Sequence, residues 1–222
     1  MKTIRLILLI FFGATFFSGC FLKSVHPLVS EENAILIDNL EGIWESEDQR
    51  WTFINDFTKF PKVMMAMDPE LEDEEEDNEL ENAYFILFEN LEDIDPDTAL
   101  FIGAATELNG AYFLDLYVFA RSIDQIEESE STFVDNHFFK VHTFSKISIN
   151  DSKLSIELFA SSFISELISA NRIRINHEKT DDGTLITAST KELRKFVSKY
   201  ANEEDAYENA FELSYRGYNL ED

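Results

Sequence analysis

The clearest structural signal in this chain is the run Asn-Gly-Ala-Tyr-Phe-Leu-Asp-Leu-Tyr-Val-Phe at residues 109–119. Asn-Gly is the dipeptide that most strongly favours a two-residue hairpin turn, because both residues tolerate a positive φ. The nine residues that follow alternate between two faces, as in a β-strand. One face is aromatic with a single carboxylate, and it carries Phe113, Asp115, Tyr117 and Phe119. The run therefore predicts the second strand of an antiparallel hairpin.

Apolar runs of strand length recur on both sides of this hairpin. They lie at residues 40–45, 50–54, 83–88, 99–104, 138–149, 153–159, 172–175 and 184–187. Turn-forming residues separate them, and successive short antiparallel strands are typical of a barrel or a sandwich. We therefore predict a mainly β fold of the α+β class, an antiparallel barrel or sandwich.

Two stretches follow the spacing of a helix, residues 162–168 and 189–200. In the second stretch, Ser189 and Glu192 match a capping box, and the apolar residues fall on one stripe. A further short helix through Tyr207 and Phe211 is also compatible with the pattern. We expect one or two helices in the C-terminal half, laid on the sheet or across a barrel mouth.

A basic start and an apolar run from Ile4 to Phe17 precede Cys20, the single cysteine of the chain. The apolar run is shorter than the roughly 20 residues of a membrane span and has the order of a cleaved export signal. Residues 17–20, Phe-Ser-Gly-Cys, resemble a bacterial lipobox. That resemblance implies cleavage after residue 19, attachment of diacylglycerol and an amide-linked acyl chain such as palmitate to Cys20, and a place in the cell envelope. Since Phe21 rather than an aspartate follows, the sorting pattern of enterobacterial lipoproteins implies the periplasmic side of the outer membrane rather than the inner membrane.

About 200 residues remain after cleavage, which suits a single domain. We expect a lipid anchor and short spacer at residues 20–39 and one globular domain at residues 40–222. The chain has 44 acidic and 18 basic side chains, a formal charge of −26, and an acidic loop is predicted near residues 68–82. This charge disfavours nucleic acids and anionic lipid head groups as partners.

Two further resemblances concern the fold. Residues 27–44, 114–116, 141–144 and 185–193 resemble an uncharacterised group of bacterial lipoproteins, which implies no particular activity. Gly42-Ile43-Trp44 resembles the Gly-any-Trp sequence that opens the first strand of lipocalins, in which the tryptophan plugs the closed end of the barrel. The second resemblance implies a lipocalin-like barrel with a ligand cavity.

The sequence contains no Gly-any-Ser-any-Gly elbow, phosphate loop, His-Glu-any-any-His helix or dinucleotide fingerprint. Residues 93–97 begin like a calcium loop, but the required glycine is missing and Ala104 replaces the bidentate glutamate, so we predict a turn there. We therefore expect no metal and no cofactor, and we name no catalytic residue. Enzymatic activity stays open, because catalytic groups can converge from scattered positions.

Asp115 is the strongest candidate for a ligand contact. A carboxylate among aromatic side chains costs free energy unless it is paired or protonated. It could anchor a ligand in a cavity, accept backbone amides, or pair with an arginine such as Arg121 or Arg172. His142 is the histidine with the most apolar neighbours. Our candidate ligand-binding residues are Trp44, Phe113, Asp115, Tyr117 and His142.

These features predict a membrane-tethered envelope lipoprotein that binds an apolar small molecule or an envelope partner. The alternative is a structural or accessory scaffold that binds no small molecule. A cavity with aromatic walls around Trp44 and Phe113 would favour the binding module. A packed interior with one exposed apolar patch would favour the scaffold.

Overall fold

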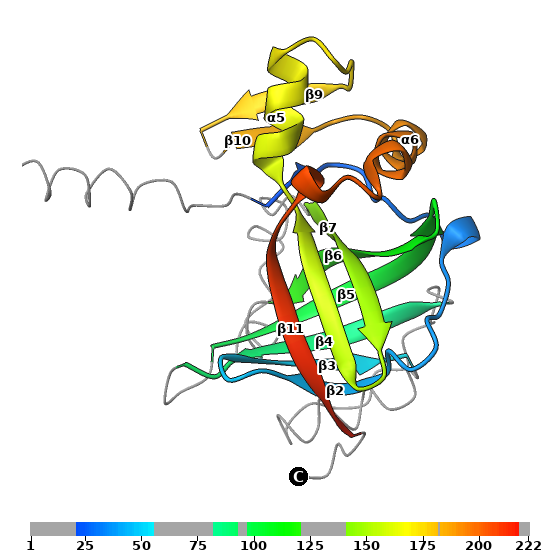
Figure 1. Cartoon of the computed structure of the whole chain (residues 1–222), viewed down its shortest axis with the longest axis vertical. Coiled ribbons are helices and arrows are strands. Elements are labelled where there is room, and N and C mark those ends of the chain that lie inside the picture. The colour runs from blue at the N-terminus through cyan, green and yellow to red at the C-terminus, as the bar shows by residue number, and fades with distance from the viewer. Residues whose placement is uncertain (1–20, 56–81, 93–96, 121–140, 182, 218–222) are drawn as a thin grey trace, which may run out of the picture.

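Eight strands of the computed structural model close into an antiparallel barrel (Figure 1). The structure describes residues 21–55, 82–92, 97–120, 141–181 and 183–217, so the predicted leader, Cys20, the acidic block and Arg121 lie outside the described residues. The barrel strands are β2 (Gly42–Glu45), β3 (Gln49–Ile54), β4 (Ala83–Asn90), β5 (Asp97–Leu108), β6 (Ala111–Ala120), β7 (His142–Asn150), β8 (Lys153–Phe159) and β11 (Tyr207–Gly217). The predicted mainly β antiparallel fold is confirmed, as a closed lipocalin-like barrel rather than a sandwich.

Tight turns set the register of the barrel strands. At the β5–β6 turn, Asn109 has φ 53° and Gly110 has φ 78°, and Leu108 pairs with Ala111. The predicted Asn-Gly hairpin is thereby confirmed. The predicted hairpin at residues 40–54 is confirmed too, because Trp44 of β2 lies opposite Trp51 of β3.

Large side chains fill the interior of the barrel. Trp44, Phe53 and Tyr84 are each at most 1% exposed, and Leu114 and Leu213 belong to the same core. An eight-stranded barrel is just wide enough for side chains to fill it, or to hold one small ligand. In this protein the side chains themselves occupy the space around Trp44.

The Gly-any-Trp sequence joins the first and last strands of the barrel. Gly42 has φ 124°, and a Cβ at that position would lie 2.6 Å from the ring of Tyr215 on β11. The same Tyr215 ring packs edge-on against Trp44, with centroids 5.1 Å apart. Glycine is therefore required at position 42 by both the backbone conformation and the space that Tyr215 occupies.

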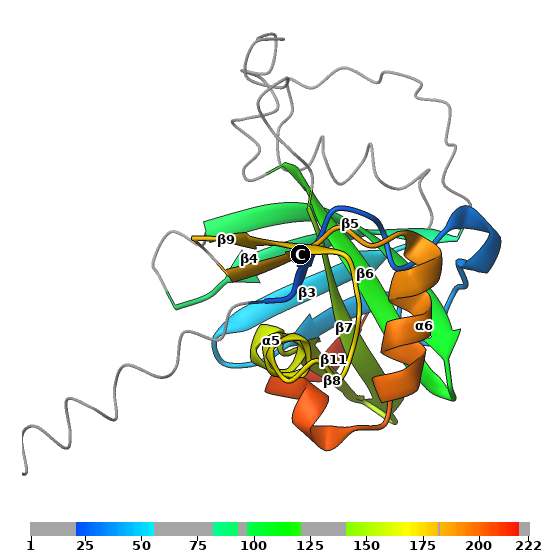
Figure 2. The same cartoon turned by 90° about the horizontal axis from the view of Figure 1, so that it is seen from above.

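A cap, defined here as residues 161–200, lies at one end of the barrel (Figure 2). Its elements are α5 (Ser161–Ser169), β9 (His177–Thr180), β10 (Gly183–Ile186) and α6 (Thr190–Tyr200). A second hydrophobic core joins the cap to the outer wall of the barrel and includes Phe113, Phe159, Leu167 and Phe196. The helices predicted at residues 162–168 and 189–200 are thus confirmed.

The predicted capping box of α6 is present. The Glu192 carboxylate accepts hydrogen bonds from the hydroxyl of Ser189 at 2.8 Å and from its backbone N–H at 3.1 Å. These bonds favour the ionised form and lower the pKa of Glu192. The start of α6 is therefore fixed by local chemistry.

Two predicted elements are wrong. The segment through Tyr207 and Phe211 is not a helix but β11, which pairs with β8 on one side and β2 on the other and so closes the barrel. The strand predicted at residues 172–175 lies instead at His177–Thr180, because the turn before Gly183 pairs Gly183 with Thr180. Residues 173 and 175 instead pack against the core beneath the cap.

The segment Phe21–Leu40, which we call the strap, packs against the barrel and the cap. Phe21 already pairs with Ala160, and β1 (Lys23–Ser24) pairs with both β7 and β10. The strap continues through η1 (Glu31–Asn33) and ends with Leu40 in the barrel interior. Residues 21–40, most of which were expected to form a spacer, therefore pack on the barrel at several points.

Tyr84 links the strap to the barrel, because its hydroxyl accepts the Ile37 N–H at 2.7 Å. Burial raises the pKa of Tyr84 above its usual value. The neutral phenol is therefore favoured in the folded state. Its contribution to the free energy of unfolding is complete below about pH 10 and is lost as pH rises through the pKa of Tyr84 in the folded state. We therefore expect the free energy of unfolding to fall as pH rises above about 10, and so to be lower at about pH 11 than at about pH 8.

The Tyr84→Phe variant isolates this effect. It should be less stable than wild type at about pH 8, because the Ile37 N–H loses its acceptor, but should lose less stability by about pH 11. Tyr117 and Tyr207 also have pKa values raised by burial, so part of the alkaline loss remains. Urea titrations at the two pH values measure both changes, and an identical loss in the two proteins would contradict the assignment.

Candidate functional site

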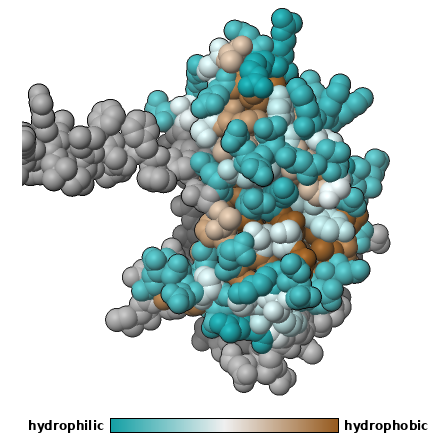
Figure 3. Space-filling model, in the orientation of Figure 1, coloured by the Kyte–Doolittle hydropathy of each residue, from teal (hydrophilic) through white to brown (hydrophobic). Residues whose placement is uncertain are grey.

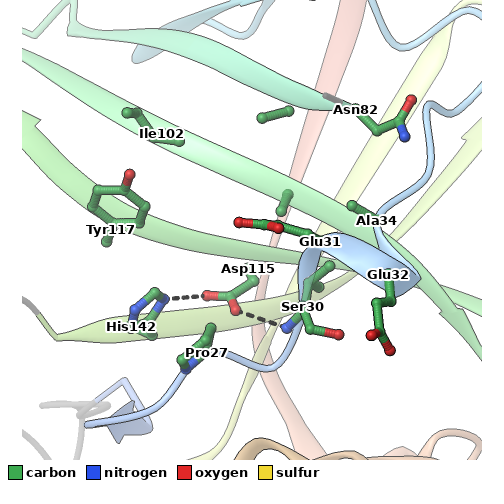
Figure 4. Close-up of a pocket in the computed structure, with 13 residues that line it drawn as sticks. Pro27, Ser30, Glu31, Glu32, Ala34, Asn82, Ile102, Asp115, Tyr117 and His142 are labelled. Atoms are coloured by element: carbon green, nitrogen blue, oxygen red, sulfur yellow. Dashed lines mark hydrogen bonds and ion pairs between the residues drawn. The ribbon is translucent and has the colours of Figure 1, made fainter. Parts of the chain in front are cut away.

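A groove of about 570 Å³ lies between the strap and the outer wall of the barrel (Figure 4). Pro27, Val29 and Ala34 line it from the strap, and Ile102 and Ala104 line it from β5. These wall residues point outward, because the alternate residues of β5 belong to the barrel interior. The groove is therefore separate from the barrel interior in which lipocalins hold their ligands.

The groove is unfilled because several of the side chains that line it are small. Ala83 on β4, Ala104 on β5 and Ala34 on the strap all face it, whereas the barrel interior is filled by aromatic and branched residues. The strap crosses this part of the wall, held by Asp115 at one end and by the pairing of Ile35 with Ala105 at the other. The hollow results from alanines beneath a segment that is fixed on both sides.

Asp115 lies at the base of the groove and is 3% exposed. Its Oδ2 accepts the backbone N–H groups of Leu28 at 2.5 Å and Val29 at 3.1 Å. Its Oδ1 lies 2.9 Å from Nδ1 of His142. The carboxylate is thus paired with two strap amides and one imidazole, and neither predicted arginine is needed. Arg172 lies exposed on the cap.

His142 is oriented by this bond. An ionised carboxylate only accepts hydrogen bonds, so Nδ1 carries the proton and Nε2 remains an acceptor. Within the described residues, Nε2 has no hydrogen-bond partner, and the side chain is 17% exposed. The ring of Tyr117 lies beside the imidazole, tilted by 59°, at a centroid distance of 5.3 Å. Burial and, secondly, the charge of Asp115 raise the pKa of Tyr117 and keep it neutral.

The charges around the groove are acidic. Glu31 and Glu32 are exposed at its rim, and no described lysine or arginine lines it. An anionic ligand would meet only repulsion from these carboxylates. The arrangement suits a neutral or cationic molecule with an apolar body. Such a molecule would also need an N–H or O–H group that can donate a hydrogen bond to Nε2 of His142.

Arg194 of α6 holds the strap from the cap side. Its Nη1 donates to the Leu28 carbonyl at 3.3 Å and to Thr106 Oγ1 at 3.2 Å, and that hydroxyl donates to the Asn33 carbonyl at 3.0 Å. Burial lowers the pKa of Arg194. Neither Arg194 nor Thr106 was predicted from the sequence. The only signal for this contact was the apolar Leu28-Val29 pair in a segment expected to be a spacer.

The structure brings together three of the five candidate ligand residues. Asp115, Tyr117 and His142 line the groove. Trp44 lies in the barrel interior and Phe113 in the core beneath the cap. These two residues therefore share no cavity, because they point to opposite sides of the barrel wall.

Comparisons with models of protein families, with curated proteins and with solved structures find no match for this chain. Among the described residues, no three His, Cys, Asp or Glu side chains gather as a metal site would require. None of the helices described is both long and apolar enough to cross a bilayer.

Proposed function

We propose that this protein is a lipid-anchored binding module of the bacterial cell envelope, and that its groove holds an apolar or amphipathic small molecule. The proposed anchor is a diacylglycerol on Cys20, supported by the resemblance of residues 17–20 to a lipobox. Two or three acyl chains would hold the protein on a membrane essentially permanently. The periplasmic face of the outer membrane is the proposed location.

The Asp115–His142 pair carries the proposal. The pair fixes one ring nitrogen of His142 and leaves Nε2 without a described partner beside a groove with an apolar wall. A small number of placed polar groups in an otherwise apolar hollow is the usual composition of a ligand site. The proposed ligand rests its apolar part on Ile102 and Ala104 and donates a hydrogen bond to His142.

A structural or accessory scaffold without a small-molecule ligand is the second candidate. The filled interior of the barrel favours it, because the space that lipocalin-like carriers use is taken by Trp44, Phe53 and Tyr84. On that alternative, the Asp115–His142 pair serves only to fix the strap. The two candidates differ in whether anything occupies the groove.

Variants that fill the groove distinguish the binding module from the scaffold. Ala104→Phe places a ring in the space proposed for the ligand, whereas Ser148→Phe adds the same ring at an exposed site on β7 that does not line the groove. The probe is an organic extract of the host envelope, and the readout is native mass spectrometry of the purified protein. We expect wild type and Ser148→Phe to retain added mass and Ala104→Phe to retain at least about tenfold less, a loss of about 1.4 kcal/mol in binding.

Thermal unfolding of each variant shows whether it is folded. If Ala104→Phe unfolds, Ala34→Phe fills the same groove from the strap without altering a barrel strand. Added mass that survives in a folded groove-filling variant would contradict binding in the groove. Wild type without any added mass would favour the scaffold.

A further inference from the structure

The chain is acidic as a whole, so its net charge does not distinguish one part of the surface from another. It carries 44 acidic and 18 basic side chains. On the face shown in Figure 3, hydrophilic residues cover most of the surface, and apolar side chains are exposed in smaller areas among them. The charge that a ligand would meet is therefore set by the groups nearest to the groove.

The lining of the groove is negative. Three carboxylates belong to it, those of Glu31, Glu32 and Asp115, and no described lysine or arginine does. With His142 neutral, as its bond to Asp115 indicates, the three carboxylates give a formal charge of −3. A protonated His142 would still leave −2, so the sign does not depend on the protonation of the imidazole.

Two basic side chains of the surrounding elements leave this charge in place. Lys23 pairs with Thr143, the residue after His142, but does not line the groove. Arg194 approaches the strap from the cap side, where it donates to the Leu28 carbonyl. Neither cation is bonded to a carboxylate of the groove within the described residues.

The carboxylates at the rim also lack partners. Within the described residues, neither Glu31 nor Glu32 forms a salt bridge, although both begin η1 at the edge of the groove. In Figure 4, the side chain of Glu31 extends across the groove, whereas that of Glu32 points away from it. The negative charge at the mouth of the groove is therefore available to a ligand.

The walls favour an organic ligand over a metal ion. Val29, Ile102 and Ala104 offer apolar surface, and among the described residues no three metal-ligating side chains gather. A metal ion needs several polar ligands, whereas an apolar wall suits hydrocarbon. The ring of Tyr117 adds an aromatic surface of the kind that attracts ammonium groups.

We propose that the ligand of the groove is an amphipathic organic cation, a protonated amine that carries an apolar chain or ring. This inference rests on the proposed function and names the ligand class of the same site. The hydrocarbon part lies on Ile102 and Ala104, and the ammonium lies between Glu31 and His142, with one N–H donated to Nε2. A neutral molecule could donate the same hydrogen bond but would gain nothing from the carboxylates.

Three probes with the same chain separate charge from hydrophobicity: octylamine, 1-octanol and octanoate. At about pH 7.5 the amine is a cation, the alcohol is neutral and the carboxylate is an anion. Isothermal titration calorimetry of the purified protein measures each Kd. We expect octylamine to bind at least about tenfold more tightly than octanol, and octanoate to show no saturable binding. About 0.5 M salt should reduce the advantage of the amine, because the rim carboxylates are exposed and are screened.

Two double variants remove the same amount of charge at different places. In Glu31→Gln/Glu32→Gln, the preference for octylamine over octanol should fall to about threefold or less. The control is Glu204→Gln/Asp205→Asn, at the exposed acidic start of η3 (Glu204–Ala206), which does not line the groove. The control should keep the wild-type preference. Thermal unfolding shows whether each variant is folded.

The outcomes separate this proposal from the proposed function. Equal affinity for octylamine and octanol in wild type, with both lost in a folded Ala104→Phe variant, would overturn the preference for cations and leave the groove as the binding site. An equal loss of preference in the two double variants would overturn it too, since the cause would be the overall charge. Absence of binding by all three probes would count against the groove itself and would overturn both proposals.

Discussion

Replacing Asp115 with alanine is expected to lower the free energy of unfolding by about 3–5 kcal/mol. The change removes the acceptor of two backbone N–H groups, those of Leu28 and Val29, and the partner of His142 Nδ1. A buried donor left unpaired costs about 1–3 kcal/mol, and three lose their partner here. Urea denaturation followed by the fluorescence of the buried Trp44 and Trp51 measures the loss.

Asp115→Asn separates hydrogen bonding from charge. Its amide oxygen can still accept the strap N–H groups, and its NH₂ can donate to His142 in the other tautomer, so we expect a smaller loss of about 1–2 kcal/mol. Asp48→Ala, at an exposed turn, is the control and should change stability by less than about 0.5 kcal/mol. A loss below about 1 kcal/mol in Asp115→Ala would show that the strap does not depend on this carboxylate.

Leu213→Asp is expected to abolish the folded barrel. Leu213 is fully buried on β11 and packs in the barrel interior opposite Leu154. A carboxylate there has no described partner, and its burial costs more than about 4 kcal/mol, a large part of the 5–15 kcal/mol that stabilises a typical domain. Near-ultraviolet circular dichroism and size-exclusion chromatography of the variant report whether the barrel forms.

The neighbouring position provides the control. Glu212 lies on the same strand but is exposed, so Glu212→Gln should change stability by less than about 0.5 kcal/mol. The stability of Leu213→Ala should lie between those of Leu213→Asp and Glu212→Gln. We expect it to lose about 2–5 kcal/mol of the free energy of unfolding, because the change leaves a cavity in the core. If Leu213→Asp folded with near wild-type stability, the tail would not be the strand that closes the barrel.

Elements with a strong local pattern were predicted well. The Asn109-Gly110 turn, the β2–β3 hairpin and α6 with its capping box all depend on residues within a few positions of one another. Their geometry follows from backbone preferences and from the alternation of apolar residues, which the sequence displays directly. The shared face of Phe113, Asp115 and Tyr117 was predicted for the same reason, whereas its position on the outside of the barrel was not predicted.

The C-terminal strand was mistaken because its apolar spacing fits a helix. Tyr207 and Phe211 are four residues apart, which places them on one face of a helix. In β11 a register shift between Glu208 and Phe211 instead puts Tyr207 against the core beneath the cap and Phe211 against the barrel interior. The strand forms because β8 and β2 would otherwise each have an unpaired edge. Pairing with β11 satisfies the backbone groups of both edges. No local pattern in residues 207–217 indicates that these two edges need a partner.

The groove was likewise beyond the reach of sequence reasoning. Its main bond joins Asp115 to Leu28, which are 87 residues apart, and the same strap is held by Arg194 from α6. The sequence identified Asp115 and His142 as unusual, but Asp115 had several possible partners and no partner was predicted for His142. Their meeting depends on the strap crossing the wall at that point.

The sequence by itself determined the local elements: the hairpins, the two helices, the alternating faces of the strands and a carboxylate that needed a partner. These follow from short-range physics, in which each residue constrains its near neighbours. The tertiary structure alone decided that the barrel closes with β11, that its interior is packed, and that the hollow lies outside under the strap. Those outcomes depend on which distant segments bury one another's apolar surface and pair one another's backbone groups, which is a property of the whole chain.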